Sequence, residues 1–190
     1  MNYDIIVLGS GPGGYVTAIR ASQLGFKTAV IERESLGGIC LNWGCIPTKA
    51  LLKSANVFEY LSHASDYGID VKGAKADFSA MINRSRGVAS GMSSGIQFLM
   101  KKNKIDVLNG NGVLKANKTV SVTDDKGVST DYTASKGVVI ATGARSRQLP
   151  NLPQDGEKVI GYREAMSLKT QPKKMVVVGS GAIGVEFAYF

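Results

Sequence analysis

The chain has 190 residues, enough for one complete domain and part of another. A hydrophobic fraction of 44% and a charged fraction of 20% exclude a disordered chain. No apolar run reaches the roughly 18 residues needed to cross a bilayer, which excludes a membrane-spanning helix. The formal charge of +8 comes from scattered Lys and Arg residues, so we interpret it as a solvated basic surface and expect no nucleic acid partner.

The N-terminal region predicts a βαβ unit. Residues 3–9 are a continuous apolar strand of the parallel type, and a Gly-rich turn follows them. Residues 15–24 have helical periodicity and stop at Gly25, which suits a C-terminal cap, and residues 28–32 are a second strand. Because the chain opens on a buried strand with no basic segment before it, we expect no targeting peptide and a cytoplasmic protein.

The turn between the first strand and the first helix fits the pattern G-x-G-x-x-G, with glycines at positions 9, 11 and 14. In this motif the first glycine permits a tight turn, the second lets the backbone approach a pyrophosphate, and the third lets helix and strand pack closely. Amide groups at the start of the helix then face the phosphates. Glu32 ends the next strand, where a carboxylate accepts hydrogen bonds from ribose hydroxyls. The pattern therefore predicts a dinucleotide site.

The middle of the chain is mixed. We expect helices over about 40–62 and 78–103, then a small antiparallel β-meander over 105–135 that is inserted into the first domain. Residues 137–143 return to a buried strand of the parallel type, and residues 144–156 form a linker rich in proline and glycine.

The opening pattern then occurs a second time. Residues 174–179 repeat the first strand, and residues 179–184 repeat the glycine turn. A helix begins after this turn and is cut off at Phe190, the last residue of the chain. The predicted fold is α/β: a Rossmann-like domain with an inserted antiparallel meander over 1–146, then a linker and the truncated start of a second Rossmann-like domain over 147–190. We therefore expect a piece of a longer protein.

Two cysteines, Cys40 and Cys45, are the only ones in the chain. In an ideal helix, positions i and i+5 lie roughly 8.6 Å apart at Cα, whereas a disulfide needs about 4.4–6.8 Å. A bridge would require a distorted first turn, which Gly44 makes easier, and such a bridge should be readily reduced. The alternative is two unrelated buried cysteines. A C-x4-C pair with no second ligand pair is a poor zinc pattern, so we expect no metal site.

The sequence around these cysteines resembles a known family. The run from Gly38 to Lys49 is similar to the redox-active disulfide motif of the dihydrolipoamide dehydrogenases, a branch of the pyridine nucleotide–disulfide oxidoreductases. Leu41-Asn42 and the run 46–52 are closer to this branch than to the glutathione and mercuric reductases, which share the cysteine spacing. Trp43 departs from the commoner Val at its position.

The resemblance implies unequal roles for four side chains. Cys45 is the thiol beside the flavin, which forms the charge-transfer complex, and Cys40 is the interchange thiol that meets the substrate. Lys49 approaches the flavin N5, where a cation stabilises the charge of the reduced flavin. Glu186, on the helix after the second glycine turn, pairs with Lys49. The acid–base His–Glu pair of this family belongs to a C-terminal interface domain, and we expect the single histidine, His63, to be a surface residue.

The resemblance also implies two cofactors, FAD and NAD. The loops at 110–112 and 141–143 are similar to segments that contact FAD in the family. The predicted FAD-binding residues are Gly9, Gly11, Pro12, Gly13, Gly14, Glu32, Arg33, Gly38, Lys49, Gly112, Ala141, Thr142 and Gly143. The predicted NAD-binding residues are Gly179, Gly181, Ala182, Ile183 and Gly184. Ala182 stands where relatives often carry a larger side chain that gates the flavin.

The function implied by the resemblance is oxidation of dihydrolipoamide with reduction of NAD⁺, as the flavoprotein component of 2-oxo acid dehydrogenase complexes. The implied partners are the dihydrolipoyl groups of the acyltransferases and a second copy in a homodimer. Two alternatives stay open at this point: a related disulfide reductase of the glutathione or mercuric type, and a nucleotide-binding fragment without turnover.

Overall fold

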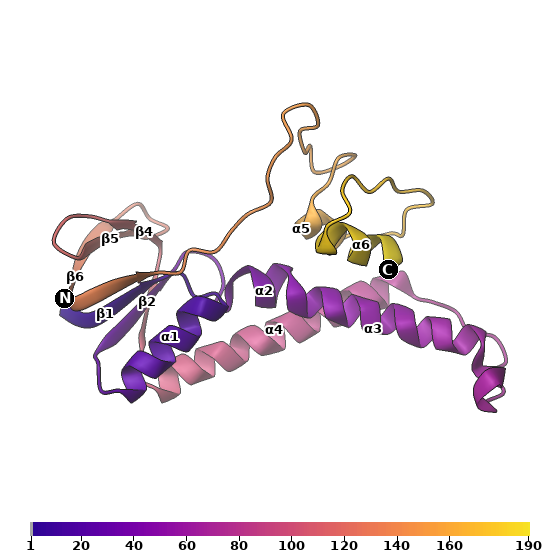
Figure 1. Cartoon of the computed structure of the whole chain (residues 1–190), viewed down its shortest axis with the longest axis horizontal. Helices are drawn as coiled ribbons and strands as arrows, with labels where there is room; N and C mark the ends of the chain where they lie inside the picture. The colour runs from indigo at the N-terminus through magenta and orange to yellow at the C-terminus, as the bar shows by residue number, and fades with distance from the viewer. Residues whose placement is uncertain (1) are drawn as a thin grey trace. The chain divides into compact units, whose positions relative to one another are not determined.

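The computed structural model describes residues 2–190, which divide into two compact units. Within residues 2–190, the first unit comprises 2–42 with Ser90–Arg145, and the second comprises Trp43–Ala89 with Ser146–Phe190. The division at 146/147 between a FAD-binding and an NAD-binding domain remains a prediction. The strands are β1 (Asn2–Leu8), β2 (Thr28–Glu32), β3 (Asp106–Asn109), β4 (Asn111–Leu114), β5 (Thr119–Thr123) and β6 (Ser129–Ile140) (Figure 1). The helices are α1 (Pro12–Gln23), α2 (Gly38–Trp43), α3 (Cys45–Ser62), the short 3-10 helix η1 (Ala64–Tyr67), α4 (Phe78–Lys102), α5 (Tyr162–Ala165) and α6 (Ala182–Tyr189).

The six strands within the described residues form one mixed sheet in the order β3-β2-β1-β6-β5-β4. The strands β3, β2, β1 and the second half of β6 pair in parallel, whereas β4, β5 and the first half of β6 pair antiparallel. The α/β fold class is therefore confirmed. The prediction that residues 107 and 108 belong to the antiparallel meander is wrong, because β3 pairs in parallel with β2.

Strand β6 joins the two kinds of pairing. Its residues 129–133 pair with β5, and its residues 133–140 pair with β1. The register slips by one residue between these parts, since Tyr3 faces Ala134 but Ile5 faces Gly137. The predicted separation between a meander ending at 135 and a new strand at 137 is therefore wrong. One strand with a bulge serves both, because a bulge bends a strand without ending its pairing. The end of β6 is also less buried than predicted for the strand over 137–143, because Ile140 is 66% exposed.

The sheet has its main core on one face. The buried cluster consists of alternate residues from neighbouring strands, because successive side chains of a strand point to opposite faces. Its members are Tyr3, Ile6, Leu8, Ala29, Ile31, Val120, Val122 and Ala134. Helix α1 packs on β1 and β2, with Ala18 fully buried. This core fixes the strand ends from which the turns at Gly9 and after Glu32 emerge.

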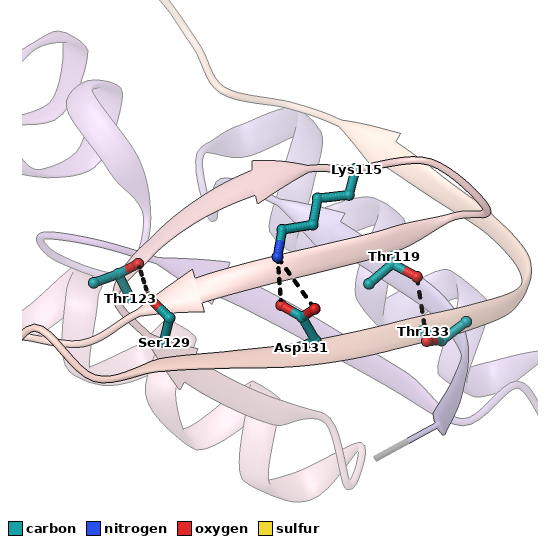
Figure 2. A network of polar contacts seen from close by, with 6 residues as sticks. All are labelled: Lys115, Thr119, Thr123, Ser129, Asp131 and Thr133. Atoms are coloured by element: carbon teal, nitrogen blue, oxygen red, sulfur yellow. Dashed lines mark hydrogen bonds and ion pairs between the residues drawn. The ribbon is translucent and has the colours of Figure 1, made fainter.

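Polar cross-strand pairs line the exposed side of the meander (Figure 2). Thr119 and Thr123 lie opposite Thr133 and Ser129, with hydroxyl oxygens 3.4 and 2.8 Å apart. Between them, Lys115 Nζ donates to both oxygens of the carboxylate of Asp131 at 3.0 and 3.1 Å. Hydrogen bonds to the Ser121 hydroxyl and to Lys115 lower the pKa of Asp131. The alternation of apolar and polar residues in β5 therefore gives a core face and a solvated face.

The expected helix over 40–62 is two helices. Helix α2 ends at Trp43 and α3 begins at Cys45, so the chain breaks at Gly44, whose φ of −146° and ψ of −120° are not helical. The continuous helix was wrong because helical periodicity does not reveal a one-residue interruption between two helical segments. The expected helix over 78–103 is confirmed as α4, which ends at Lys102.

The second unit has a small core of its own. Leu51 of α3, Ile82 of α4 and Met166, which follows α5, are each at most 6% exposed and pack together. Phe78, Phe187 and Phe190 pack against them, and the rings of Phe78 and Phe190 stack with centroids 5.8 Å apart. Apolar side chains from four helical segments therefore hold α5 and α6 against α3 and α4.

Residues 174–179 do not form the predicted strand. The segment has no ladder partner among residues 2–190, and the side chains of Val176 and Val178 are 88% and 64% exposed. A parallel strand is stable only within a sheet that satisfies its backbone groups and covers its side chains. The apolar pattern of this segment is therefore that of a buried strand, while its environment here is that of a loop.

None of the helices within residues 2–190 combines the length and the apolar character needed to cross a membrane.

Candidate functional site

The first glycine turn is built as the motif predicts. Gly9 has a φ of +93°, which L side chains rarely adopt, and a Cβ there would lie 2.3 Å from the carbonyl oxygen of Ala141. A Cβ on Gly14 would lie 1.9 Å from the carbonyl oxygen of Gly9. The chain itself therefore requires glycine at these two positions, because any side chain would separate α1 from the end of β1.

Packing of the fold does not explain the glycines at positions 11 and 13 of this turn. A Cβ on Gly11 or Gly13 would meet no heavy atom within 4 Å, so the fold does not exclude a side chain at either place. Gly11 precedes the first residue of α1, and Pro12 occupies that first position. A helix N-terminus flanked by glycines without side chains, with its free amides and the positive end of the helix dipole, is suited to a phosphate group. The turn therefore fits the pyrophosphate of a dinucleotide.

A buried serine links this turn to Glu32. The hydroxyl of Ser10 donates to Glu32 Oε2 at 2.6 Å, and the amide of Ser10 donates to the same oxygen at 3.0 Å. The other oxygen, Oε1, accepts the amides of Arg33 and Glu34, both at 2.9 Å. Glu32 thus holds the turn against the end of β2. Ser10 was not among the predicted site residues, although a fully buried hydroxyl within a glycine turn needs such a partner.

Two further predicted segments meet the turn. The amide of Ala141 donates to the carbonyl oxygen of Leu8 at 2.8 Å, which places the 141–143 loop beside Gly9. Gly38 lies against Gly11, where a Cβ would be 2.7 Å from the Cα atom of Gly11. Gly143 and Gly38 both have positive φ, +70° and +61°. The structure therefore brings these loops together at the carboxyl ends of β1, β2 and β6, where ligands of open α/β sheets bind.

Core packing explains why position 112 is a glycine, which was not predicted from the sequence. A Cβ at this position would lie 2.5 Å from Leu8 Cδ2 and 3.1 Å from Ile31 Cγ2, so glycine lets β4 approach the core. The neighbouring Gly110 donates its amide to the carbonyl oxygen of Glu32 at 2.9 Å. The loop therefore lies at the end of β2, where a contact with the adenosine half of FAD would require it. The glycine at position 112 itself is explained by core packing alone.

The two cysteines are joined by a disulfide bond. Neither is a free thiol, and the chain contains no other cysteine. Cys45 is exposed and Cys40 is half-buried. The bond spans the break between α2 and α3 at Gly44, so the distorted turn that the spacing required is present. The alternative of two unrelated buried cysteines is wrong, because the sulfurs are bonded and one cysteine is exposed.

Two buried polar side chains fix the loop that carries the cysteines. Asn42 is 7% exposed, and its Nδ2 donates to the carbonyl oxygens of Leu36 and Gly38, both at 3.0 Å. Thr48 is 6% exposed, and its Oγ1 donates to the carbonyl oxygen of Gly44 at 2.7 Å. Both residues belong to the motif that resembles the family, but no role was predicted for either. Their role here is to satisfy backbone carbonyls at an irregular turn.

Trp43 lies between the cysteines in the sequence and contacts two arginines. The guanidinium of Arg86 lies over the indole ring at 4.1 Å from its centroid, and that of Arg163 lies at 5.2 Å. Both distances are within the range of a cation–π interaction. Trp43 departs from the residue usual in the family motif, and its contact with the arginines was not predicted, because positions 43, 86 and 163 are brought together only by tertiary packing.

Lys49 and Glu186 form an ion pair through Nζ and Oε1. Lys49 lies one turn after Cys45 on α3, and Glu186 lies on α6, so the pairing implied by the family resemblance is present. The Lys49 side chain is 62% exposed and that of Glu186 is 27% exposed. Their roles toward a flavin remain a proposal.

The second glycine turn repeats the geometry of the first. Gly179 has a φ of +114°, and a Cβ on Gly184 would lie 2.4 Å from the carbonyl oxygen of Gly179. Gly181 precedes the first residue of α6, Ala182, and a Cβ on Gly181 would meet nothing within 4 Å. Ile183 is 57% exposed. This turn therefore also leaves an open helix N-terminus.

His63 is half-buried and lies beside two tyrosines. Its ring centroid is 5.9 Å from those of Tyr60 and Tyr67. His63 is thus partly exposed, as expected of a surface residue, with two aromatic neighbours beside its ring.

Residues 3–190 match the family described as pyridine nucleotide-disulphide oxidoreductase. Relatives called dihydrolipoyl dehydrogenase include that of Rhizobium etli, 51% identical over 205 residues, and that of Zymomonas mobilis, 50% identical over 189 residues. Both alignments cover 100% of this chain but 42% and 40% of the relatives. The crystal structure of LpdA from Mycobacterium tuberculosis is similar with a TM-score of 0.88 at 27% identity, covering 97% of this chain and 42% of that one. The chain thus spans about two fifths of the length of these relatives.

Proposed function

Because the chain belongs to the pyridine nucleotide-disulphide oxidoreductase family, we propose that it carries the flavin-binding and disulfide part of a dihydrolipoyl dehydrogenase. The observation that carries this proposal is the disulfide between Cys40 and Cys45 at the break between α2 and α3. An exposed bridge at an interrupted helix is typical of reactive disulfides, whereas a structural bridge is generally inaccessible to reduction. The similar relatives also bear the name of this activity.

The proposed reaction begins at the disulfide. A thiolate of the substrate dithiol attacks Cys40 Sγ, the bond between the two sulfurs breaks, and Cys45 leaves as a thiolate. The second substrate thiol then attacks the mixed disulfide, which releases the cyclic disulfide product and leaves Cys40 reduced. Two electrons have passed to the cysteine pair. Cys45 is suited to the leaving role because it begins α3, where the helix dipole favours an anion.

The residues around the first glycine turn would hold FAD. The open N-terminus of α1, with Gly11, Pro12 and Gly13, would receive the pyrophosphate, and Gly9 and Gly14 would keep the turn compact. Glu32 and Arg33 would contact the ribose, and Gly38 with the loops at 110–112 and 141–143 would complete the site. When bound, the flavin would accept two electrons from the cysteine pair and pass them as hydride to a nicotinamide.

The second unit would contribute a cation and the nicotinamide nucleotide turn. Lys49, held by Glu186, would place positive charge where reduction of the flavin builds negative charge. The open turn at Gly179, Gly181 and Gly184, with Ala182 and Ile183, would receive the pyrophosphate of NAD⁺.

The proposed setting follows from the relatives. Dihydrolipoyl groups of 2-oxo acid dehydrogenase acyltransferases would be the partners, a second copy would complete a homodimer, and the cytoplasm would be the compartment. A glutathione or mercuric reductase is the rival within the family, and a nucleotide-binding fragment without turnover is the rival outside it. Dihydrolipoamide-dependent reduction of NAD⁺ distinguishes the first, and the flavin absorbance spectrum of the purified chain distinguishes the second.

The decisive experiment compares two glycine variants. Gly11→Val puts a side chain into the space at the N-terminus of α1, where an added Cβ meets no heavy atom within 4 Å, so flavin content should fall at least tenfold while the circular dichroism spectrum stays unchanged. Gly181→Val is the matched control, since it fills the same place in the second turn and should spare the flavin. Full flavin retention in Gly11→Val would overturn the assignment, and loss in Gly181→Val alone would reverse the two turns.

A second experiment separates the cysteines. Cys40→Ser leaves Cys45 as the thiol beside the flavin, so it should give a long-wavelength absorption band that disappears on acidification. Cys45→Ser should give none. Bands in the opposite variants would exchange the two roles.

A further inference from the structure

A chain of hydrogen bonds through a buried serine ends on Glu32. Ser10 is fully buried within the first glycine turn. The amide of Gly37 donates to Ser10 Oγ at 3.2 Å and to the carbonyl oxygen of Ser10 at 3.1 Å. Ser10 Oγ in turn donates to Glu32 Oε2 at 2.6 Å. All three residues belong to the first unit, where the serine hydroxyl links the loop before α2 with the carboxylate at the end of β2.

The contact with Gly37 fixes the direction of the Ser10 proton. A hydroxyl has one proton to donate and two lone pairs that accept. Because the Gly37 amide donates to Ser10 Oγ, the proton of this hydroxyl points away from Gly37 and toward Glu32 Oε2. A hydroxyl that donates to a carboxylate at such a short distance forms a hydrogen bond about twice as strong as a neutral one. The bond from Ser10 therefore holds Oε2 firmly.

Backbone amides hold the rest of the Glu32 carboxylate. Oε1 accepts the amides of Arg33 and Glu34, both at 2.9 Å, and Oε2 also accepts the amide of Ser10 at 3.0 Å. Carboxylate oxygens accept hydrogen bonds over a broad range of directions, so a ribose hydroxyl can join these donors. Glu32 is only half-buried, which leaves its side chain within reach of a ligand. Of the four bonds, the one from the Ser10 hydroxyl is the only one that a side-chain substitution removes.

We propose that Ser10 is a positioning residue that holds the Glu32 carboxylate in the orientation in which it accepts the ribose hydroxyls of the dinucleotide. The inference deepens the proposed function, because it rests on a nucleotide at the first glycine turn with its ribose at Glu32. A side chain that is already held loses less conformational freedom when a ligand binds, so more of the hydrogen-bond energy contributes to affinity. In this role Ser10 acts through Glu32.

The test compares two ligands that differ only in the ribose hydroxyls, ADP and 2′,3′-dideoxy-ADP. Isothermal titration calorimetry of the flavin-free full chain gives the ratio of their dissociation constants, and binding that Gly11→Val removes is binding at the first turn. Wild type should bind ADP at least about tenfold more tightly, because the dideoxy ligand lacks the hydrogen bonds to a charged group. Ser10→Ala should reduce this preference to about threefold or less, since the ribose hydroxyls then meet a carboxylate that is less firmly held.

The ratio separates a positioning role from a structural one. A loss of stability lowers the apparent affinity for both ligands by the same factor, so it cancels in the ratio. Ser10→Thr keeps the hydroxyl and should keep most of the wild-type preference. Ser22→Ala is the control, since it removes a hydroxyl that donates to the carbonyl oxygen of Asn103 near the other end of α1 and should leave the ratio unchanged.

A second variant covers a failure to fold. Circular dichroism reports whether each protein is folded. If Ser10→Ala is unfolded, Ser10→Cys replaces it, because a thiol has a similar size but is only a weak donor. The preference for ADP should fall in Ser10→Cys as well.

The outcomes distinguish this inference from the proposed function. A preference for ADP in Ser10→Ala equal to that of wild type would overturn the positioning role and leave Glu32 as the ribose acceptor. A larger preference would also overturn it, because the hydroxyl would then compete with the ribose for Glu32. A wild-type chain that does not prefer ADP, or that binds ADP equally well as Gly11→Val, would contradict the proposed function itself, since the nucleotide would not lie at Glu32.

Discussion

The two glycine turns, 9–14 and 179–184, have nearly the same local structure in very different surroundings. In each, the first glycine has a positive φ and the last could not carry a Cβ without meeting the carbonyl oxygen of the first. In each, the third residue is an extended glycine that precedes a helix, with φ of −62° at Gly11 and −70° at Gly181. The conformation of such a turn is therefore local and follows from the spacing of its glycines.

The segments that lead into these turns differ completely. β1 lies between β2 and β6, and its Ile6 is fully buried. The equivalent residue of the second copy, Val176, is 88% exposed in a segment that pairs with no strand among residues 2–190. A turn is thus satisfied by its own backbone, whereas a parallel strand depends on neighbours contributed by distant parts of the chain.

The largest expected effect comes from the last glycine of each turn. Gly14→Val places a side chain where even a Cβ would lie 1.9 Å from the carbonyl oxygen of Gly9, so it should lower the free energy of unfolding by about 4 kcal/mol or more. Gly184→Val meets the same clash in a turn outside the sheet, so helix α6 should fray while the first unit stays folded. Chemical denaturation followed by circular dichroism measures both. Equal losses would show that the second turn is as embedded as the first.

Truncation of the preceding strands should separate the two copies further. Ile6→Ala removes a fully buried side chain from the sheet core and should cost about 3 kcal/mol in the free energy of unfolding. Val176→Ala removes an exposed one and should change it by less than about 0.5 kcal/mol. The measurement is urea unfolding of the full chain. A loss above about 2 kcal/mol for Val176→Ala would mean that this segment is packed in solution.

The serines within the turns provide a smaller and more specific contrast. Ser10→Ala removes the hydroxyl that donates to Glu32 at 2.6 Å and should cost about 2 kcal/mol, because a carboxylate oxygen loses a close donor. Ser180 is the exposed counterpart in the second turn, and Ser180→Ala should cost almost nothing. Thermal unfolding compares the pair. Should Ser10→Ala be neutral, Glu32 would not brace the turn.

The smallest effect concerns the start of β1 and depends on pH. Tyr3 is 3% exposed, and its hydroxyl donates to Asp106 at 2.9 Å. Burial and this hydrogen bond raise the pKa of Tyr3 to about 12, from 10.0. A raised pKa stabilises the folded state in full below pH 10 and loses this contribution as pH rises toward 12. The free energy of unfolding of the wild type should exceed that of Tyr3→Phe by about 1 kcal/mol at pH 8.

The measurement for Tyr3 is the difference in free energy of unfolding between the two proteins at pH 8 and near pH 11.5. The difference should shrink at the higher pH. A difference that is constant with pH would mean that Tyr3 is not held as the neutral phenol, and the beginning of β1 would then be as weakly fixed as its counterpart before the second turn.

Local patterns in the sequence were sufficient for much of the site. The glycine spacing gave both turns, the apolar run at 28–32 gave β2 within its observed bounds, and the cysteine motif led to the disulfide. These features depend on neighbours within a few residues, or on a motif whose geometry is fixed by its own backbone. The family resemblance also led to the pair of Lys49 with Glu186, which periodicity and spacing did not suggest.

The tertiary structure decided what depends on remote partners. The sequence alone determined that 107–108 and 174–179 have the character of strands. Only the tertiary structure decided that 107–108 pair in parallel with β2, whereas 174–179 pair with no strand among the described residues. Likewise, Trp43 was one unusual residue in a motif until packing of α4 and α5 brought Arg86 and Arg163 to its ring. The physical reason is the same in each case: hydrogen-bond ladders and cation–π contacts need partners whose distance is set by the fold and not by their separation along the chain.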